Sequence, residues 1–339
     1  MNLSDFDYRL PPELIAQAPL ADRASSRMLV IDRKSGTWLD RSFRDLPEYV
    51  RPGDCLAVND SRVIPCRLLG QMEDRAREVE LFLLRPVSAD RFTWQALARP
   101  GRQLKPGARV RFSPTLAAAV LATGERGERT VRFETAGAID DELDRTGHVP
   151  LPPYIKRPDT GEDRTRYQTV YASERGSVAA PTAGLHFTPE MLDACRLAGA
   201  TIARLTLHVG LGTFQPLSSE YVEKNHLHSE HFEISGEAAA ALAEARRIVA
   251  VGTTAARTLE SAMIRGGLSA MRGETDIFIY PGFEFKAVGA MLTNFHLPKS
   301  SLLLLVCALA GTELMLAAYR HAVKERYRFF SYGDCMLIL

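Results

Sequence analysis

Two segments of the chain carry histidines in surroundings suited to proton transfer. Residues 176–188 combine small side chains, one proline and His186 in a run with neither helical nor strand periodicity. Small side chains let the backbone approach a ligand closely, and imidazole exchanges protons near neutral pH. A strand-like run then brings His208 to a glycine-rich turn at residues 210–212. We interpret the two segments as walls of an enzyme cleft; the alternative for each is a tight turn with a structural histidine.

Histidines are concentrated in the second half of the chain. Seven of the eight lie between His186 and His321, which places proton chemistry in that half. His226, His228 and Glu230 alternate in the sequence. On an extended strand they would share one face, where two imidazoles and a carboxylate can bind a divalent metal. A metal-dependent hydrolase is therefore one alternative, although no other residues complete a metal set and we predict no metal.

The run from Val249 to Thr254 reads as a strand that ends at the start of a helix. A helix N-terminus offers unpaired N–H groups to an anionic or hydroxyl-bearing ligand. Ordinary capping of the helix by threonine is the simpler explanation. The chain contains no Gly-x-Gly-x-x-Gly after a strand and no Walker lysine loop. It therefore lacks the motifs that best indicate an enzyme that binds a dinucleotide or a nucleoside triphosphate.

Two groups of cationic residues indicate contact with RNA. The first has no intervening acidic residue and comprises Arg99, Arg102, Lys105, Arg109 and Arg111. The second lies among tyrosines and comprises Lys156, Arg157, Arg164 and Arg166 with Tyr154, Tyr167 and Tyr171. Cations beside aromatic rings suit phosphate contact and base stacking, although a solvated charged face is the more common cause of such a run. A non-catalytic RNA-binding protein would need these groups but not the histidines.

Composition limits the class of protein. The 339 residues are 46% hydrophobic, with 42 basic against 41 acidic side chains, so a nucleic acid would have to bind a local patch. The five cysteines are scattered without a Cys-x-x-Cys pair, which predicts free thiols in a reducing compartment. The N-terminus lacks the features of a secretory signal, and the longest apolar run, 302–310, is far short of the roughly 20 residues that span a bilayer. We predict a cytoplasmic protein without membrane contact.

The elements that must position these residues change in type along the chain. Short strand-like runs separated by Gly and Pro turns fill residues 62–136, and a proline-rich connector follows at 149–154. Helices and strands alternate after the connector, which predicts parallel strands. We therefore predict an α/β main domain, residues 1–61 and 150–339, with a mostly parallel, barrel-like or Rossmann-like sheet, and an inserted small all-β barrel domain, 62–149. We also expect a short helix at 12–17 and a strand at 275–280.

Several motifs, in order along nearly the whole chain, resemble one enzyme family. They include Val-Asn-Asp-Ser-Arg-Val at 58–63, Gly-His-Val-Pro-Leu-Pro-Pro-Tyr at 147–154, His-Val-Gly-Leu-Gly-Thr-Phe at 208–214, Thr-Asn-Phe-His-Leu-Pro-Lys-Ser at 293–300 and Phe-Ser-Tyr-Gly-Asp at 330–334. Together they resemble the bacterial S-adenosylmethionine:tRNA ribosyltransferase-isomerases of queuosine biosynthesis. The chain departs from the family pattern at Asn225, which replaces a histidine, at 255–256, where two alanines replace Ser-Val, and at Gly289, which replaces an acid.

The resemblance implies a reaction with two substrates. S-adenosylmethionine would donate its ribosyl group to 7-aminomethyl-7-deazaguanine at the wobble position of a tRNA with a GUN anticodon. The products would be epoxyqueuosine-tRNA, adenine and methionine. The carbon at C5′ lies beside a sulfonium that acidifies its protons, so the reaction needs a general base, and departure of adenine needs a general acid. The family also implies a monomer without an obligate protein partner.

The resemblance and the residue types together give three sets of site residues. For the reacting centre we predict His186, His208, His228, Glu230 and Asp334. For the polar groups of the donor we predict Gly252, Thr253, Thr254, Arg257 and Glu260. For tRNA we predict Arg62, Arg99, Arg102, Arg166, Tyr167 and Lys299. The working hypothesis is that the histidine-bearing face and the arginine-lined barrel meet at a common pocket.

Overall fold

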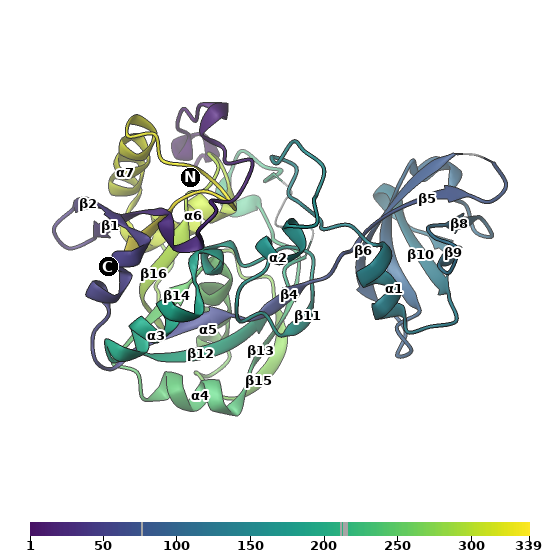
Figure 1. Cartoon of the computed structure of the whole chain (residues 1–339). Helices are drawn as coiled ribbons and strands as arrows, with labels where there is room; N and C mark the ends of the chain where they lie inside the picture. Colours follow the sequence, from purple (N-terminus) through teal and green to yellow (C-terminus); the bar gives the residue numbers. More distant parts are fainter. Residues whose placement is uncertain (76, 211, 213–215) are drawn as a thin grey trace.

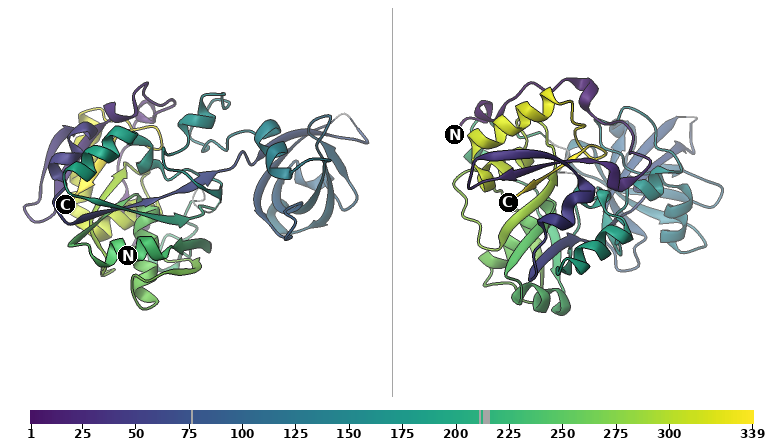
Figure 2. Two further views of the ribbon diagram at one scale, coloured as in Figure 1. Left: turned by 60° about the horizontal axis from the view of Figure 1, so that its bottom comes forward. Right: turned by 60° about the vertical axis from the view of Figure 1, so that its left-hand side comes forward.

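A computed structural model describes residues 1–75, 77–210, 212 and 216–339. They form a larger α/β body and a smaller closed β-barrel (Figure 1). The barrel stands to one side of the main body in Figure 1 and in the left view of Figure 2, joined to it by the segments that enter and leave the barrel, and it lies partly behind the main body in the right view. Part of the glycine-rich turn expected after His208, namely residue 211 and residues 213–215, lies outside the described residues.

A nine-stranded sheet forms the centre of the main body, in the order β15-β13-β12-β3-β14-β16-β17-β1-β2. Its strands are β1 (Arg27–Asp32), β2 (Thr37–Ser42), β3 (Asp54–Asn59), β12 (Thr201–Leu207), β13 (Glu230–Ile234), β14 (Arg247–Val251), β15 (Met271–Thr275), β16 (Val288–Asn294) and β17 (Cys335–Ile338). The inner strands β12, β3, β14 and β16 are parallel, and antiparallel pairings of β13 with β12 and of β17 with β16 continue the sheet outward. Because β12 and β14 lie on opposite sides of β3, a crevice is expected at the carboxyl ends of these strands.

Helices cover both faces of the sheet. They are α3 (Pro189–Leu197), α4 (Gly236–Ala243), α5 (Thr253–Ile264), α6 (Ser301–Ala310) and α7 (Thr312–Lys324). Apolar residues of α4 to α7 share one core with alternate residues of the strands, whereas α3 and the 3₁₀ helix η4 (Phe43–Tyr49) share the core on the other face. Every residue of β3 is buried, as expected for a central parallel strand covered on both sides.

The helix starts follow local capping chemistry. The Thr188 hydroxyl accepts a hydrogen bond from the Met191 amide at 3.3 Å, and the Ser300 hydroxyl accepts one from Leu303 at 3.2 Å. Such caps satisfy amides that lack partners within the helix. Thr188 and Ser300 are therefore the N-caps of α3 and α6, and the cap at Ser300 holds the chain between β16 and α6.

The barrel is a closed six-stranded antiparallel sheet, β10-β7-β6-β5-β8-β9. Its strands are β5 (Arg67–Met72), β6 (Glu78–Pro86), β7 (Thr93–Arg99), β8 (Arg109–Arg111), β9 (Ala117–Thr123) and β10 (Glu128–Glu134), and α1 (Ile139–Thr146) packs on its core. A parallel ribbon of β4 (Ser61–Val63) and β11 (Glu174–Ser177) lies between barrel and main sheet, near the short α2 (Asp163–Arg166). A β-bridge between Arg67 and His148 ties the two chain segments that enter and leave the barrel.

The predicted fold class is confirmed, with differences in detail. The sheet is mixed, because antiparallel strands extend its parallel centre. The strand expected at 275–280 is wrong: β15 ends at Thr275, and the apolar residues after it pack on the core from a loop. The helix expected at 12–17 is reduced to a 3₁₀ turn, Pro12–Leu14, because Ile15 forms a bridge with Phe329. The exact domain boundaries stay a prediction.

All five cysteines are buried and unpaired. In the part of the chain that the structure describes, no single helix has the length and apolarity to cross a membrane. Helices α6 and α7 reach those criteria only when taken as a pair, and they are bent by 117° relative to each other.

Candidate functional site

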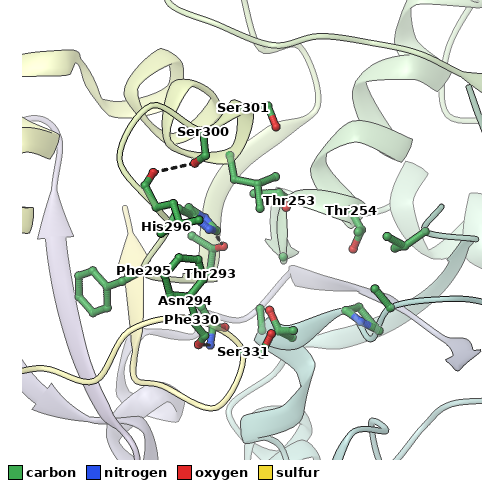
Figure 3. A pocket seen from close by; sticks show the side chains of 18 of the residues that line it. Thr253, Thr254, Thr293, Asn294, Phe295, His296, Ser300, Ser301, Phe330 and Ser331 are labelled. Atoms are coloured by element: carbon green, nitrogen blue, oxygen red, sulfur yellow. Dashed lines mark hydrogen bonds between the residues drawn. The ribbon is translucent and has the colours of Figure 1, made fainter. Parts of the chain in front are cut away.

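The main cavity opens beside the carboxyl ends of β14 and β16 and has a volume of about 320 Å³. Its walls come from the β14–α5 turn, the loop between β16 and α6, the loop before α3, and the proline-rich connector. Figure 3 shows Thr253 and Thr254 on one side, with Asn294, His296, Ser300 and Ser331 around the remaining wall. These loops converge because their parent strands are parallel neighbours.

The β14–α5 turn presents the start of a twelve-residue helix to the cavity. Gly252 has a φ of 90°, a conformation that other residues rarely adopt, and this lets the chain turn directly from strand into helix. The Thr254 hydroxyl is buried without a hydrogen-bond partner among the described residues. An unsatisfied buried hydroxyl beside a helix N-terminus favours a polar or anionic group of a ligand.

The opposite wall is held by buried hydrogen bonds. His296 Nε2 lies 3.1 Å from the Thr293 hydroxyl, and the His296 amide donates to the Tyr319 hydroxyl at 3.0 Å. Burial lowers the pKa of His296 to about 3, so its imidazole is neutral at physiological pH. The Asn294 amide nitrogen donates to the Phe330 carbonyl at 2.9 Å. This wall is therefore polar, uncharged and rigidly positioned.

Two aromatic rings form a flat side of the main cavity. Tyr154 of the connector stacks on Phe330 with ring centroids 4.3 Å apart and planes 29° from parallel. The Tyr154 hydroxyl lies 2.6 Å from the Ser331 hydroxyl, which fixes the ring. The buried ring of Tyr167 lines the same cavity, and burial raises the pKa of its hydroxyl well above the ordinary value. Such a surface suits a planar heterocycle.

A second cavity of about 220 Å³ adjoins the main one. It is lined by His226, His228 and Glu230, and it shares with the main cavity a wall made of Pro216, Leu217, Arg257, Ser301 and Leu302. Arg257 and Glu230 form a buried ion pair in this wall. The Gly210 amide also donates to Glu230, at 2.8 Å.

The structure gives little support to the metal-dependent alternative. The described residues contain no group of three His, Cys, Asp or Glu side chains arranged to hold a metal ion. The extended strand β13 begins only at Glu230, so His226 and His228 precede it in a loop and do not share a strand face with it. The carboxylate of Glu230 is engaged by Arg257 and Gly210.

Of the five residues predicted for the reacting centre, only His228 and Glu230 line a cavity that adjoins the β14–α5 turn. His186 is buried behind the main cavity, with Nδ1 2.9 Å from the Ser26 hydroxyl and Nε2 3.4 Å from the Asn294 oxygen. His208 follows the end of β12 and packs on His231 with ring centroids 6.1 Å apart, whereas its neighbour Val209 lines the main cavity. Burial and the neighbouring His231 lower the pKa of His208.

Two of the predicted site residues, Asp334 and Glu260, have carboxylates whose hydrogen bonds indicate a structural role. Asp334 is buried and accepts hydrogen bonds from the backbone amides of Arg27 and Arg328, at 3.0 and 2.8 Å, and burial raises its pKa. Glu260 accepts from three consecutive amides, those of residues 286–288, at 2.9 Å each. Both side chains therefore fix loops and lie outside the linings of the two cavities. The other predicted donor residues, Gly252, Thr253, Thr254 and Arg257, all line the main cavity.

The predicted RNA-binding cations do not form one surface. In the barrel, Arg109 and Arg111 are paired with Glu73 and Glu134, while Arg99 and Arg102 have no ion pair among the described residues. Arg166 donates to the carbonyls of residues 20 and 21, and Arg62 lies exposed on β4. Lys299 lines the main cavity and pairs with Asp7 at 2.8 Å.

A groove at the base of the barrel holds other cations. This groove, of about 850 Å³, lies between the barrel and the connector and includes Arg99 and Lys156. Arg67 and Arg157 also line it, paired with Glu80 and Asp163. None of the histidines predicted for the reacting centre lines the groove that contains the barrel residue Arg99, contrary to the working hypothesis, although His148 does line it. The connector joins the two sites, since Pro153 lines both the groove and the main cavity.

Several residues of the main cavity are absent from the three predicted sets of site residues. Thr293, Asn294, His296, Phe330 and Ser331 line the main cavity. All five belong to the motifs at 293–300 and 330–334, which are visible in the sequence. The predicted sets contain only Lys299 and Asp334 from these motifs. Those two are the charged residues of the motifs, whereas the cavity is also lined by the neutral hydrogen-bonding groups beside them.

Fold and cavities together define a two-part α/β enzyme, with a ligand site at the ends of parallel strands and a separate cationic groove. A family model described as queuosine biosynthesis protein matches residues 3–338. The chain therefore belongs to the queuosine biosynthesis protein family.

Individual relatives match over their full length. The chain is 60% identical to an S-adenosylmethionine:tRNA ribosyltransferase-isomerase of Solibacter usitatus, over 100% of both sequences. It is 52% identical to the protein of that name from Symbiobacterium thermophilum, also over 100% of both. A crystal structure of S-adenosylmethionine tRNA ribosyltransferase from Thermotoga maritima is 38% identical, with a TM-score of 0.57 over 99% of this chain and 100% of that one.

Burial of His186 should make the free energy of unfolding depend on pH. Burial lowers its pKa to about 4 in the folded protein. The unfolded state therefore binds more protons below about pH 6.5, and stability is complete above that pH and falls as the pH drops toward 4. For one such histidine the loss between pH 7.5 and 5.5 is about 1.4 kcal/mol. We expect His186→Gln to remove about this much of the pH dependence, measured as urea unfolding free energies at both values; equal losses in variant and wild type would contradict it.

Proposed function

We propose that this protein transfers and isomerises the ribosyl group of S-adenosylmethionine onto tRNA. The observation that carries the proposal is the main cavity itself. A stacked aromatic pair, Tyr154 and Phe330, faces the same space as the open N-terminus of α5 with the unsatisfied Thr254 hydroxyl. An adenine ring needs the first feature, and the hydroxyls of a ribose need the second.

The acceptor in this proposal is a tRNA with a GUN anticodon that carries 7-aminomethyl-7-deazaguanine. The names of the relatives support tRNA as a substrate and S-adenosylmethionine as the other. The products are epoxyqueuosine-tRNA, adenine and methionine. We further propose that the protein works in the cytoplasm as a monomer and needs no metal.

The donor site follows from the lining of the main cavity. Adenine stacks beside Tyr154, and the ribose hydroxyls bond to Thr253, Thr254 and the neutral His296. A neutral imidazole in a dry wall can donate or accept a hydrogen bond without placing a positive charge beside the donor's sulfonium. His186 supports this wall from behind through Asn294, and is therefore a positioning residue.

Proton removal from C5′ is assigned to His228. Among the residues predicted for the reacting centre, His228 and Glu230 line the second cavity, and Glu230 is held by Arg257 and Gly210. His228 is exposed on the loop before β13, where it can reach the wall shared by the two cavities. An imidazole at this place can take the acidic proton beside the sulfonium.

The assay for the proposed reaction is incubation of labelled S-adenosylmethionine with precursor tRNA. We expect equimolar release of adenine and methionine only when the precursor tRNA is present, with the ribosyl carbons retained on the tRNA. Activity should persist in excess chelator. A metal-dependent hydrolase would lose activity there, and a non-catalytic RNA-binding protein would release neither product.

His228 is tested by substitution with a matched control. We expect His228→Gln to lower the single-turnover rate by about 100-fold, the usual contribution of a proton-transfer group, while affinity for S-adenosylmethionine stays within a few-fold. The control is His231→Gln, an exposed histidine of β13 that lines neither cavity. Wild-type turnover in His228→Gln would remove this residue from the mechanism.

The groove at the base of the barrel is assigned to the tRNA backbone. Arg99 and Lys156 have no ion pair among the described residues, so their charges are available to phosphates. We expect the double variant Arg99→Ala, Lys156→Ala to weaken tRNA binding at low salt and to reduce the slope of log affinity against log salt by about 1 to 2. Filter binding across a salt series measures both.

The control for the groove is Arg109→Ala, which removes a barrel arginine already paired with Glu73 and Glu134. Its salt slope should match that of the wild type. An unchanged slope in the Arg99, Lys156 double variant would show that phosphates bind elsewhere. Binding of S-adenosylmethionine should be the same in all three proteins.

A further inference from the structure

We infer that the second cavity receives the amino acid end of S-adenosylmethionine, and that Arg257 binds its carboxylate. This inference rests on the proposed function. It adds to that function that different parts of the donor molecule bind in the two cavities. The nucleoside occupies the main cavity, the methionine carboxylate and ammonium occupy the second, and the sulfonium lies at the wall between them. The carrying observation is the incomplete hydrogen bonding of a buried arginine in that wall.

Arg257 is buried, with 6% of its surface exposed, and lines both cavities. One terminal nitrogen, Nη1, donates to Glu230, and Nε donates to the Ile277 carbonyl at 3.3 Å. The other terminal nitrogen, Nη2, is buried and has no hydrogen-bond partner among the described residues. An unsatisfied donor on a buried cation is costly, and a carboxylate is the group that fits a guanidinium best.

The charge of the wall selects a zwitterion. Glu230 already balances Arg257, so an anion alone would leave a net negative charge in a buried place. An α-amino acid brings a carboxylate and an ammonium one carbon apart. With the carboxylate on Arg257 and the ammonium near Glu230, the charges alternate and the sum stays zero. A carboxylate has about four acceptor positions, so Glu230 can keep its bonds to Arg257 and Gly210 while it receives the ammonium.

The two cavities also differ in a way that matches the two ends of the donor. The main cavity combines the stacked rings with hydroxyl groups. The second cavity contains Asn225, His226 and His228 in addition to the ion pair. Leu217 and Leu302, in the shared wall, are the apolar neighbours of the methylene groups between sulfur and the amino acid carbon. One extended molecule can therefore span both spaces.

The test compares two donors that differ by one carboxylate. Calorimetry would measure binding of S-adenosylmethionine and of its decarboxylated analogue to the wild type, Arg257→Met and Arg257→Lys. We expect Arg257→Met to weaken S-adenosylmethionine binding by about 10- to 100-fold, the range for a lost charged hydrogen bond. Decarboxylated S-adenosylmethionine should lose no affinity, since it has no carboxylate to lose and its ammonium meets a Glu230 that Arg257 no longer neutralises.

The second variant and a control keep the result decisive. Arg257→Lys retains the charge beside Glu230, so the variant should fold. It cannot form the bidentate contact of a guanidinium with a carboxylate, so it should lose affinity for S-adenosylmethionine but not for the decarboxylated analogue. Arg265→Lys, a change at the end of the same helix outside both cavities, should leave both affinities unchanged. Equal losses for the two donors in both Arg257 variants would overturn the inference while leaving the proposed function intact. Failure of the wild type to bind either donor would overturn the proposed function itself.

Discussion

Parallel pairing of β12, β3, β14 and β16 is the constraint on which the arrangement of the site depends. Parallel neighbours require long crossovers, and here helices form them and cover both faces of the sheet. The faces are therefore closed to ligands, and the carboxyl edge is where successive loops converge. The turn after β14 and the loop after β16 meet at that edge and form the main cavity. The antiparallel strands outside this centre widen the sheet.

Neutral groups, rather than charges, hold the walls of the main cavity in place. His186 and His296 are both buried deeply enough for their pKa values to fall to about 4 and about 3. Each contacts a polar residue of the wall, Asn294 in one case and Thr293 in the other. An uncharged imidazole can satisfy both of its neighbours without the desolvation cost of a buried cation. The hydrogen-bonding groups that face the ligand space are thus fixed before any ligand arrives.

Features encoded by local chemistry were predictable from sequence, and features that depend on distant partners were not. The barrel strands follow from turn residues and alternation, and the start of α3 follows from capping by Thr188, whereas α5 begins after Gly252 without the side-chain cap expected from its threonines. His226, His228 and Glu230 alternate as a strand would, yet pairing with β15 begins only at Glu230, opposite Thr275. The basic run in the barrel looked cationic, but Arg109 and Arg111 are neutralised by Glu73 and Glu134, far away in the sequence. His296 is absent from the predicted site residues because its burial depends on Tyr8 and Tyr319, which come from opposite ends of the chain.

The separation of charge between the two sites bears directly on the proposed reaction, which joins a sulfonium cation to a polyanion. The cationic residues that line the main cavity are Arg257 and Lys299, and each is paired, with Glu230 and with Asp7. In the proposed function a sulfonium donor therefore enters without repulsion from an unpaired cation of the described residues, whereas phosphates find no such cation to attract them there. In the part of the chain that the structure describes, Arg99 and Lys156 of the groove at the barrel have no ion pair. Because Pro153 borders both spaces, in the proposed function a tRNA backbone held in the groove can extend its aminomethyl-bearing base toward the donor while its phosphates stay outside.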